Sequence, residues 1–225
     1  MQLRLGADLP KRTSAPWVFA KTTVCGMGGG PWPRTSLPAR SSRRENGRLA
    51  HVIEAATSGR AKCRGCGERI AAGVLRFGEV LPNPFADGEM THWFHLDCAA
   101  FKRPEPFLEA LAARADPLAD SGRLESEARR GIAHPRLPRI DGAERSPSGR
   151  AQCRACRSTI QKGAWRIALV FYEDGRFAPA GSIHARCAAA YFETADVLPR
   201  LRRFSPDLGD ADLAELQGEL AGPAA

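Results

Sequence analysis

The apolar positions in the first half of the chain follow a helical period and then a strand-like one. Apolar side chains at helical spacing predict a short helix over residues 49–56. The run VLRFGEVL over 74–81 predicts a strand. The turn residues PNPFADG over 82–88 predict a chain reversal into a second short strand at 89–94. This succession predicts a small α+β module.

Helical patterns follow the second strand. An Ala-rich run from Asp97 predicts a helix with Cys98 on its first turn, and PEPFLEALA over 104–112 predicts another helix. Residues 113–148 contain several prolines, glycines and charged residues, which predicts a flexible linker. The tail from Asp210 predicts an amphipathic helix that packs on the second half of the chain. Its apolar stripe consists of Leu213, Leu216 and Leu220.

A long stretch of the first module is repeated. SGRAKCRGC begins at Ser58, and SGRAQCRAC begins at Ser148. In each copy Cys-x-x-Cys is followed by His-x-x-Cys, with 28 residues between the pairs in the first copy and 27 in the second. The two sets are Cys63, Cys66, His95 and Cys98, and Cys153, Cys156, His184 and Cys187.

Three thiolates and one imidazole in two close pairs are the ligands of a tetrahedral structural Zn²⁺ site. A tight turn presents each first pair, and the long insert returns the second pair from the far side. Four protein ligands leave no open position for an activated water. His92 is a rival ligand, but the second copy has Gly181 at the corresponding place, which favours His95. We therefore expect two structural zinc ions.

The cysteine count bears on the choice between metal and disulfides. Of seven cysteines, six fall into the two ligand sets and Cys25 stands alone. A disulfide framework is the alternative in a secreted chain, but the regular pairing favours zinc thiolates in a reducing compartment. Small modules also need such a metal, because domains of this size bury only a limited core.

Charge is unevenly distributed along the chain, whose formal net charge is +8. Residues 1–50 carry 9 Lys/Arg against 2 Asp/Glu, and residues 149–190 carry 7 against 2. Residues 51–103, with 7 against 6, are nearly balanced. The second module is therefore distinctly basic and the first nearly neutral, which favours an anionic partner for the second.

These patterns predict four parts. They are a basic, disordered extension over 1–47, a zinc module over 48–112, a linker over 113–148, and a second zinc module with a C-terminal helix over 149–222. The extension is either a basic arm or a passive addition. No apolar run reaches the roughly 18 residues of a membrane span, and no secretory signal is apparent. We expect an intracellular monomer, cytoplasmic and nucleoid-associated in a bacterium or nuclear in a eukaryote.

The repeated residues resemble the poly(ADP-ribose) polymerase-type (PARP-type) zinc finger. The first copy carries SGRA, both ligand pairs, a DG turn at 87–88 and HW before the ligand histidine. The second keeps SGRA, both ligand pairs and a DG turn at 174–175, but has SI in place of HW. The resemblance spans roughly residues 50–103 and 145–190 and leaves no stretch of adequate length for a catalytic domain.

The resemblance implies a mode of DNA binding. Fingers of this family, which also occur in some DNA ligases and DNA 3′-end repair enzymes, grip the phosphate backbone at a strand break and stack apolar side chains on the exposed base pair. A break offers a base face and a flexible backbone, so cations and an apolar platform suit it better than base-edge donors.

Position by position, the resemblance implies phosphate contacts and platforms in both modules. Ordinary solvation or a carboxylate partner is the alternative for the arginines, and a place in the core is the alternative for the apolar pair of the first module. The phosphate contacts would be Arg60 and Arg76 in the first module and Arg150 and Arg166 in the second. The platforms would be Phe85 with Met90 in the first and, by alignment of the DG turns, Tyr172 with Phe177 in the second.

We therefore expect zinc-dependent, sequence-independent binding of DNA strand breaks by a damage sensor, with DNA-repair proteins as further partners. One finger would bind on each side of the break. The alternative is a zinc-stabilised adaptor in a DNA-repair complex that uses the leucine stripe. We expect no enzymatic activity, because the sequence contains no paired-carboxylate, nucleophile or nucleotide-binding arrangement.

Overall fold

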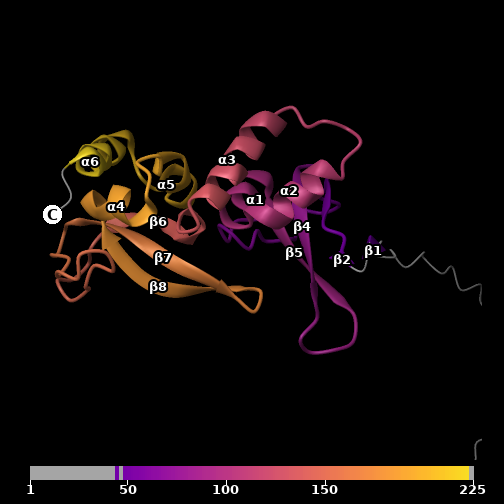
Figure 1. Ribbon diagram of the computed structural model, residues 1–225, viewed down its shortest axis with the longest axis horizontal. Coiled ribbons are helices and arrows are strands. Elements are labelled where there is room, and N and C mark those ends of the chain that lie inside the picture. The colour runs from indigo at the N-terminus through magenta and orange to yellow at the C-terminus, as the bar shows by residue number, and fades with distance from the viewer. Residues whose placement is uncertain (1–43, 46–47, 223–225) are drawn as a thin grey trace, which may run out of the picture. The chain divides into compact units, whose positions relative to one another are not determined.

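The computed structural model describes residues 44–45 and 48–222 (Figure 1). Most of the expected basic extension over 1–47, with Cys25, therefore lies outside the described residues. The described part consists of a two-stranded sheet and two three-stranded antiparallel sheets, each of the latter followed by helices. No helix within it is long and apolar enough to cross a membrane. In chain order the elements are β1 (Arg44–Glu45), β2 (Arg48–Leu49), β3 (Val52–Ala55), β4 (Leu75–Pro82), β5 (Glu89–His95), α1 (Leu96–Lys102), α2 (Pro104–Ala112), α3 (Ser121–Ala133), η1 (Leu137–Arg139), β6 (Ile140–Arg145), β7 (Trp165–Glu173), β8 (Arg176–His184), η2 (Ala185–Cys187), α4 (Ala188–Phe192), α5 (Leu198–Phe204) and α6 (Asp210–Ala221).

The first module is built on an antiparallel sheet with the strand order β3-β4-β5. The two expected strands are confirmed as β4 and β5, and the two expected helices as α1 and α2. The expected helix over 49–56 is wrong, because this segment contains β3. Val52 and Ala55 of β3 lie opposite Gly78 and Leu75 of β4. A segment this short gains little from one turn of helix, whereas pairing with β4 satisfies its backbone.

Aromatic side chains fill the core of the first module. Phe77 of β4, Phe94 of β5 and Phe107 of α2 are fully buried. The rings of Phe77 and Phe107 meet edge to face with centroids 5.6 Å apart. Burying each such side chain contributes roughly 1.5–3 kcal/mol. This packing holds the helices against the sheet, and the β4–β5 hairpin projects beyond them (Figure 1).

Residues 113–148 are structured, which corrects the expectation of a flexible linker. Helix α3 packs on α1 and α2, and its Leu124 and Ala128 are buried in the core of the first module together with Leu118. The following β6 pairs with β7 of the second module. The helix buries few side chains and two of them are small, so its apolar period in the sequence is weak.

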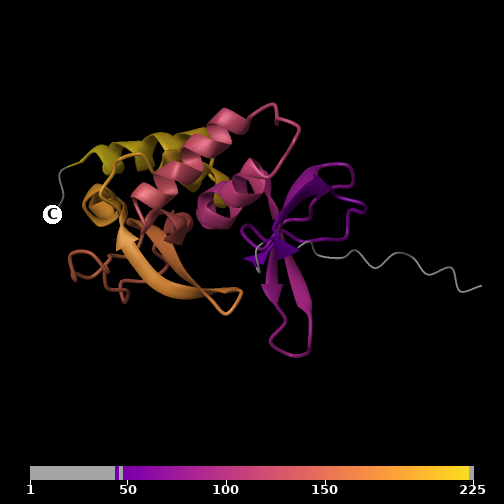
Figure 2. The same cartoon turned by 45° about the vertical axis from the view of Figure 1, so that its right-hand side comes forward.

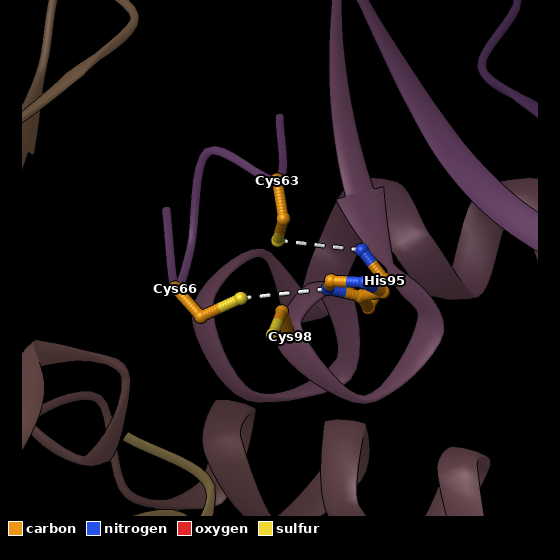
Figure 3. A group of neighbouring side chains, drawn as sticks. All are labelled: Cys63, Cys66, His95 and Cys98. Atoms are coloured by element: carbon orange, nitrogen blue, oxygen red, sulfur yellow. Dashed lines mark hydrogen bonds between the residues drawn. The ribbon is translucent and has the colours of Figure 1, made fainter. Parts of the chain in front are cut away.

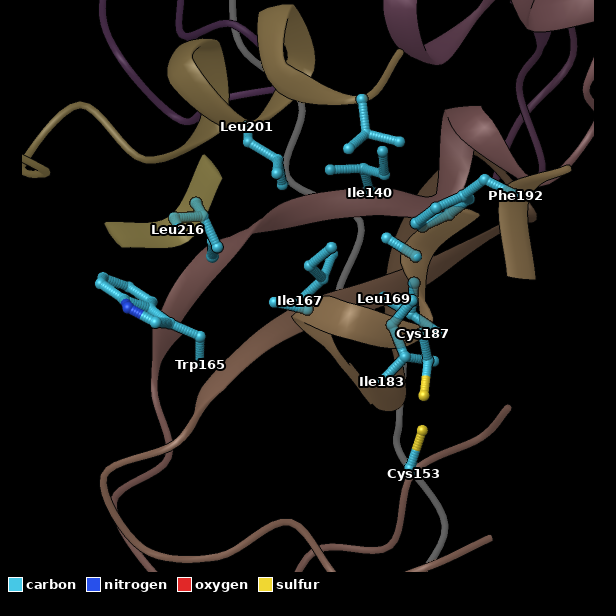
Figure 4. Close-up of a cluster of buried hydrophobic side chains, with 14 of the residues drawn as sticks. Ile140, Cys153, Trp165, Ile167, Leu169, Ile183, Cys187, Phe192, Leu201 and Leu216 are labelled. Carbon is cyan, nitrogen blue, oxygen red and sulfur yellow. The ribbon is translucent and has the colours of Figure 1, made fainter. Parts of the chain in front are cut away.

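The second module repeats the sheet in the order β6-β7-β8. Figure 4 shows its core, in which Ile167 of β7 lies opposite Ile183 of β8 and Trp165 belongs to the same cluster. Leu216 of α6 is fully buried in the same core, which confirms that the C-terminal helix packs on the second module. Both modules are therefore small α+β units, as expected.

Buried charges join the two modules, which belong to one compact unit. Arg200 of α5 is fully buried, and it donates hydrogen bonds of 3.0 and 2.9 Å to the carboxylate and the backbone carbonyl of Glu127 on α3. Lys102 of α1 is 2% exposed and donates to the Ile140 carbonyl at 2.5 Å and to Asp141 at 3.0 Å. Figures 1 and 2 show α3 beside α5. The modules are thus in direct contact.

Candidate metal centres and nucleic-acid interface

Four side chains from three segments converge at the first site (Figure 3). Cys63 and Cys66 lie in the loop between β3 and β4, His95 ends β5, and Cys98 lies on the first turn of α1. The His95 backbone N–H points to Cys63 Sγ at 3.4 Å, and His95 Nδ1 lies 3.4 Å from Cys66 Sγ. The four ligand atoms all lie within 4.8 Å of one another.

The second site repeats this geometry. His184 ends β8, and its backbone N–H points to Cys153 Sγ at 3.4 Å. His184 Nδ1 lies 3.5 Å from Cys156 Sγ, and Cys187 in η2 completes the set. The four ligand atoms again lie within 4.8 Å of one another.

The turn between the two cysteines has the same backbone in both modules. The carbonyl of Cys63 accepts from the Gly67 N–H at 2.9 Å, and that of Cys153 accepts from the Arg157 N–H at 2.9 Å. Gly67 has φ +77° and Arg157 has φ +64°. This left-handed conformation costs a non-glycine residue roughly 1–2 kcal/mol. The second module adopts the turn without its favoured residue, which indicates that the ligand geometry dictates it.

The chemistry of both sets fits zinc. Hydrogen bonds with Cys66 and Cys98 lower the pKa of the Cys63 thiol to about 3. The Ser158 hydroxyl lowers the pKa of Cys156 to about 6. Deprotonated sulfur is the form that binds metal, and three thiolates with one imidazole nitrogen match a closed tetrahedral zinc site. The expectation of two structural zinc sites is confirmed.

An arginine from far along the chain covers the first site. Arg203 of α5 donates through Nε to Cys98 Sγ at 3.2 Å, and its Nη2 lies 3.3 Å from Cys66 Sγ and 3.0 Å from His95 Nδ1. A zinc-loaded Cys₃His set carries a charge of about −1, which this guanidinium offsets. Sequence reasoning missed Arg203, because it lies 105 residues after Cys98 and no local spacing connects the two.

The arginines expected to hold phosphates are of two kinds. Arg60 and Arg150 are exposed, and each lies three residues before the first cysteine of its site. They stay predicted phosphate contacts. Arg76 and Arg166 are less accessible and have carboxylate partners.

The paired arginines occupy equivalent places in the two sheets. Arg76 of β4 lies 2.9 Å from Glu54 of β3, and Arg166 of β7 lies 2.7 Å from Glu144 of β6. Arg76 is 7% exposed and stacks on Trp93 at 3.5 Å from the ring centre. The alternative weighed for these two residues, a carboxylate partner, is the arrangement that the structure shows.

The tip of the β4–β5 hairpin presents apolar side chains. Phe85 is 81% exposed, so it is not part of the core. Met90 lies opposite Leu81 at the base of the same tip. Both Phe85 and Met90 line an open groove of about 850 Å³, which Arg64 and Arg176 also line. An exposed aromatic ring in such a groove is typical of a contact surface.

The aromatic residues of the second hairpin lie elsewhere than expected. The Tyr172 hydroxyl donates to Glu79 at 3.0 Å, and its ring lies 3.8 Å from the Arg103 guanidinium. Phe177 packs edge to face on Phe94 with centroids 6.4 Å apart. Both side chains contact the first module. These contacts correct the assignment of the two side chains as a second DNA platform. The assignment failed because the sequence does not reveal that the modules touch each other.

A buried carboxylate organises this contact. Glu79 is 1% exposed and accepts hydrogen bonds from Arg103 at 2.9 and 3.0 Å as well as from Tyr172. Burial and the Glu79 charge raise the pKa of the Tyr172 phenol. His92 is also buried here, outside the ligand sets. A Cβ at Gly175 would come within 2.7 Å of the His92 ring, so the hairpin tip approaches β5 closely.

Comparison with known proteins identifies the first module. Residues 54–133 match the family described as the poly(ADP-ribose) polymerase and DNA-ligase Zn-finger region. The match ends with α3, which agrees with the packing of α3 on the first module. The sequence resemblance to this type of finger is thereby confirmed.

Relatives with the same type of finger are much longer. A poly(ADP-ribose) polymerase of Sarcophaga peregrina is 27% identical over 143 residues, which cover 56% of this chain and 14% of the relative. Poly(ADP-ribose) polymerase 1 of Gallus gallus is 31% identical over 138 residues, which cover 55% of this chain and 14% of the relative. That of Caenorhabditis elegans is 44% identical over 50 residues, which cover 22% of this chain and 5% of the relative. The chain thus corresponds to a small part of these enzymes.

The second module shares the ligand set, the strand pairing and the cross-strand ion pair of the first. The first module therefore matches the zinc-finger region of poly(ADP-ribose) polymerases and DNA ligases, and the chain carries a second Cys₃His module of the same design in tandem with it.

Proposed function

We propose that the chain binds DNA at strand breaks, without sequence preference and only when its zinc sites are loaded, as a sensor of DNA damage. The proposal rests on the family of the first module and on the surface of its hairpin. The zinc ions are structural, since both ligand sets are complete without an open position. The chain itself is proposed not to be an enzyme.

The exposure of Phe85 is the observation that carries this proposal. Its ring is 81% exposed at the tip of a hairpin whose base is held by the first zinc site. A break exposes the face of a base pair that intact duplex keeps stacked. Stacking an aromatic side chain on a base contributes roughly 1–3 kcal/mol and tolerates any sequence. Phe85 therefore gives selectivity for the break, with Met90 extending the platform.

Arginines around the first hairpin bind the phosphate backbone of the DNA. Arg64 lines the groove beside Phe85, and Arg60 is exposed in the same loop. Arginine suits phosphate because its planar guanidinium donates two hydrogen bonds at once. Arg76 and Arg166 have carboxylate partners, so we propose that they support the sheets instead of contacting DNA.

Fluorescence anisotropy tests the proposal. Labelled duplexes of about 40 base pairs, several helical turns long, are compared intact and with one central nick at about 150 mM salt. We expect the zinc-loaded protein to prefer the nicked duplex by about tenfold or more. Phe85→Ala should remove most of this preference and leave binding to intact duplex nearly unchanged, because only the break exposes a base face.

Val74→Ala is the matched control, because Val74 is also apolar and 45% exposed but lies just before β4, at the end of the hairpin away from its tip. It should retain the preference for the nick. Equal binding of the unmodified protein to both duplexes, or a preference that survives Phe85→Ala, would contradict the proposal. A chelated sample should lose binding to both duplexes.

The adaptor alternative loses support from the placement of α6. The stripe that it required includes Leu216, which is fully buried in the second core, and Leu220, which packs against the same core. The leucine stripe therefore packs on the second module and is not available to a partner protein.

A further inference from the structure

A basic pocket lies beside the second zinc site. It is open to solvent, has a volume of about 550 Å³, and is lined by Arg136, Arg139 and Arg154 next to the ligands Cys156 and Cys187. Two of the arginines come from the segment around η1 and one from the Cys-x-x-Cys turn. None of them is among the predicted DNA contacts.

Aromatic and backbone groups hold two of these arginines in place. Arg136 Nη1 donates to the Tyr191 carbonyl at 2.9 Å. The Arg139 guanidinium lies over the ring of Phe171 at 4.6 Å from its centre, and Phe171 is 46% exposed. An arginine stacked on an aromatic face loses less side-chain freedom when it binds a ligand. The basic pocket is therefore partly preorganised.

The third arginine lies along β8. A Cβ at Gly181 would come within 2.8 Å of Arg154 Nε, so the absence of a side chain at Gly181 makes room for Arg154. Among the residues that the structure describes, Glu193 is the only carboxylate within ion-pair distance of the three guanidinium groups, at 3.4 Å from Arg136. Three positive charges outnumber this carboxylate and the single negative charge of a zinc-loaded Cys₃His set.

We infer that the basic pocket binds the phosphate backbone of duplex DNA. Three guanidinium groups beside one exposed aromatic ring match a sugar–phosphate chain, since arginine pairs with phosphate and the ring packs against a sugar. The surrounding sequence supports a long polyanion, because residues 149–190 carry 7 Lys/Arg against 2 Asp/Glu.

This inference divides the work between the modules and rests on the proposed binding of DNA. Tyr172 and Phe177 contact the first module, so the second hairpin has no free platform to stack on a base. The second module then adds affinity to any duplex through its basic pocket. Selectivity for the break comes from the first hairpin, from Phe85 with Met90.

The test is a double variant, Arg139→Gln with Arg154→Gln. Arg136 is left intact because it bonds the backbone of α4. The control, Arg129→Gln with Arg202→Gln, removes the same charge from two exposed arginines outside the pocket. Binding to intact and nicked duplexes is measured by anisotropy as a function of salt, and zinc content and circular dichroism verify that each variant is folded.

We expect the double variant to bind both duplexes roughly tenfold more weakly at about 150 mM salt, with the same ratio between them. The slope of log K against log salt should fall by about 0.9 for each lost phosphate contact. Affinity and slope equal to those of the control would overturn the inference, even where the preference for the nick persists. Conversely, a reduced slope without any preference for the nick would support the basic pocket and refute break recognition.

Discussion

Equivalent residues of the two modules have different surroundings. Phe85 at the first hairpin tip is exposed, whereas Tyr172 and Phe177 near the second tip contact the first module. The same asymmetry applies to the zinc sites. Arg203 covers the sulfurs of the first site, whereas the second site borders an open pocket. The two modules thus have similar scaffolds but different surfaces.

At the residue scale we predict that Arg203→Gln weakens zinc binding at the first site alone. The guanidinium donates to Cys98 Sγ at 3.2 Å and lies 3.3 Å from Cys66 Sγ. Losing an outer-shell partner of this kind typically lowers metal affinity about 10–100-fold. Competition with a chromophoric zinc chelator should therefore show one of two zinc equivalents released earlier.

The neighbouring Arg202→Gln serves as control, because Arg202 is exposed on the same helix. Arg202→Gln should release both zinc equivalents to the chelator as late as the unmodified protein does. Earlier release of both equivalents from the Arg203 variant would indicate general destabilisation, and no change would show that Arg203 is not needed by the site.

The zinc ligands could be predicted because their spacing is local. A turn or a helix end joins the two members of each pair, so sequence distance reports spatial distance. Arg203 and Tyr172 could not be predicted, because their partners lie 105 and 93 residues away and depend on how the modules meet. Arg76 was ambiguous for a similar reason, since its partner Glu54 lies on another strand.

At the scale of elements, α3 and α5 hold each other through one ion pair. Arg200 of α5 has no exposed surface, and its partner Glu127 on α3 is 8% exposed. Glu127 has a second partner in Arg130 at 2.7 Å, so removing Arg200 takes away its own two hydrogen bonds but leaves the carboxylate paired.

We therefore predict that Arg200→Ala lowers the free energy of unfolding by about 3 kcal/mol in chemical denaturation at saturating zinc, because two buried hydrogen bonds to Glu127 are lost.

An exposed pair on α3 itself is the comparison. Arg129 lies 2.5 Å from Glu125, with the two side chains 69% and 42% exposed. Arg129→Ala should cost no more than about 0.5 kcal/mol. Similar losses for the two arginine variants would show that the Arg200–Glu127 contact does not hold the helices together.

Elements with a strong apolar period were predictable, and those fixed by pairing were not. β4, β5, α2 and α6 match the sequence pattern closely. β3 was predicted as a helix, because four residues with mixed burial fit either period and only the edge of β4 decides. α3 was predicted as linker, because its few buried positions lie among charged residues.

At the scale of the whole molecule, the two zinc modules contact each other directly and are not joined by the expected flexible linker. Linking independent fingers would raise affinity through effective concentration. The contacts of Lys102, Arg200 and Tyr172 instead fix the modules against each other. The proposed platform at Phe85 and the basic pocket therefore belong to one compact unit rather than to two independent fingers.

We predict that trypsin cleaves poorly within residues 113–148 of the zinc-loaded protein, although the segment contains several arginines. Its backbone is held in α3, η1 and β6, so cleavage requires local unfolding. Peptide mapping should show cleavage in this segment rising about tenfold or more when zinc is removed. Rapid cleavage between α3 and β6 in the zinc-loaded protein would contradict this prediction and support a flexible linker.

The position of Arg203 has a consequence for biosynthesis. Cys98, the last ligand of the first site, leaves the ribosome 105 residues before Arg203. Because protein synthesis adds about 5–20 residues per second, Arg203 is synthesised about 5–20 s after Cys98. During that interval the thiolates of the first site are open to zinc delivery and equally to oxidants. The second site is complete within this interval, since Cys187 precedes Arg203. Arrival of α5 therefore closes the first site last, after both ions have had time to bind.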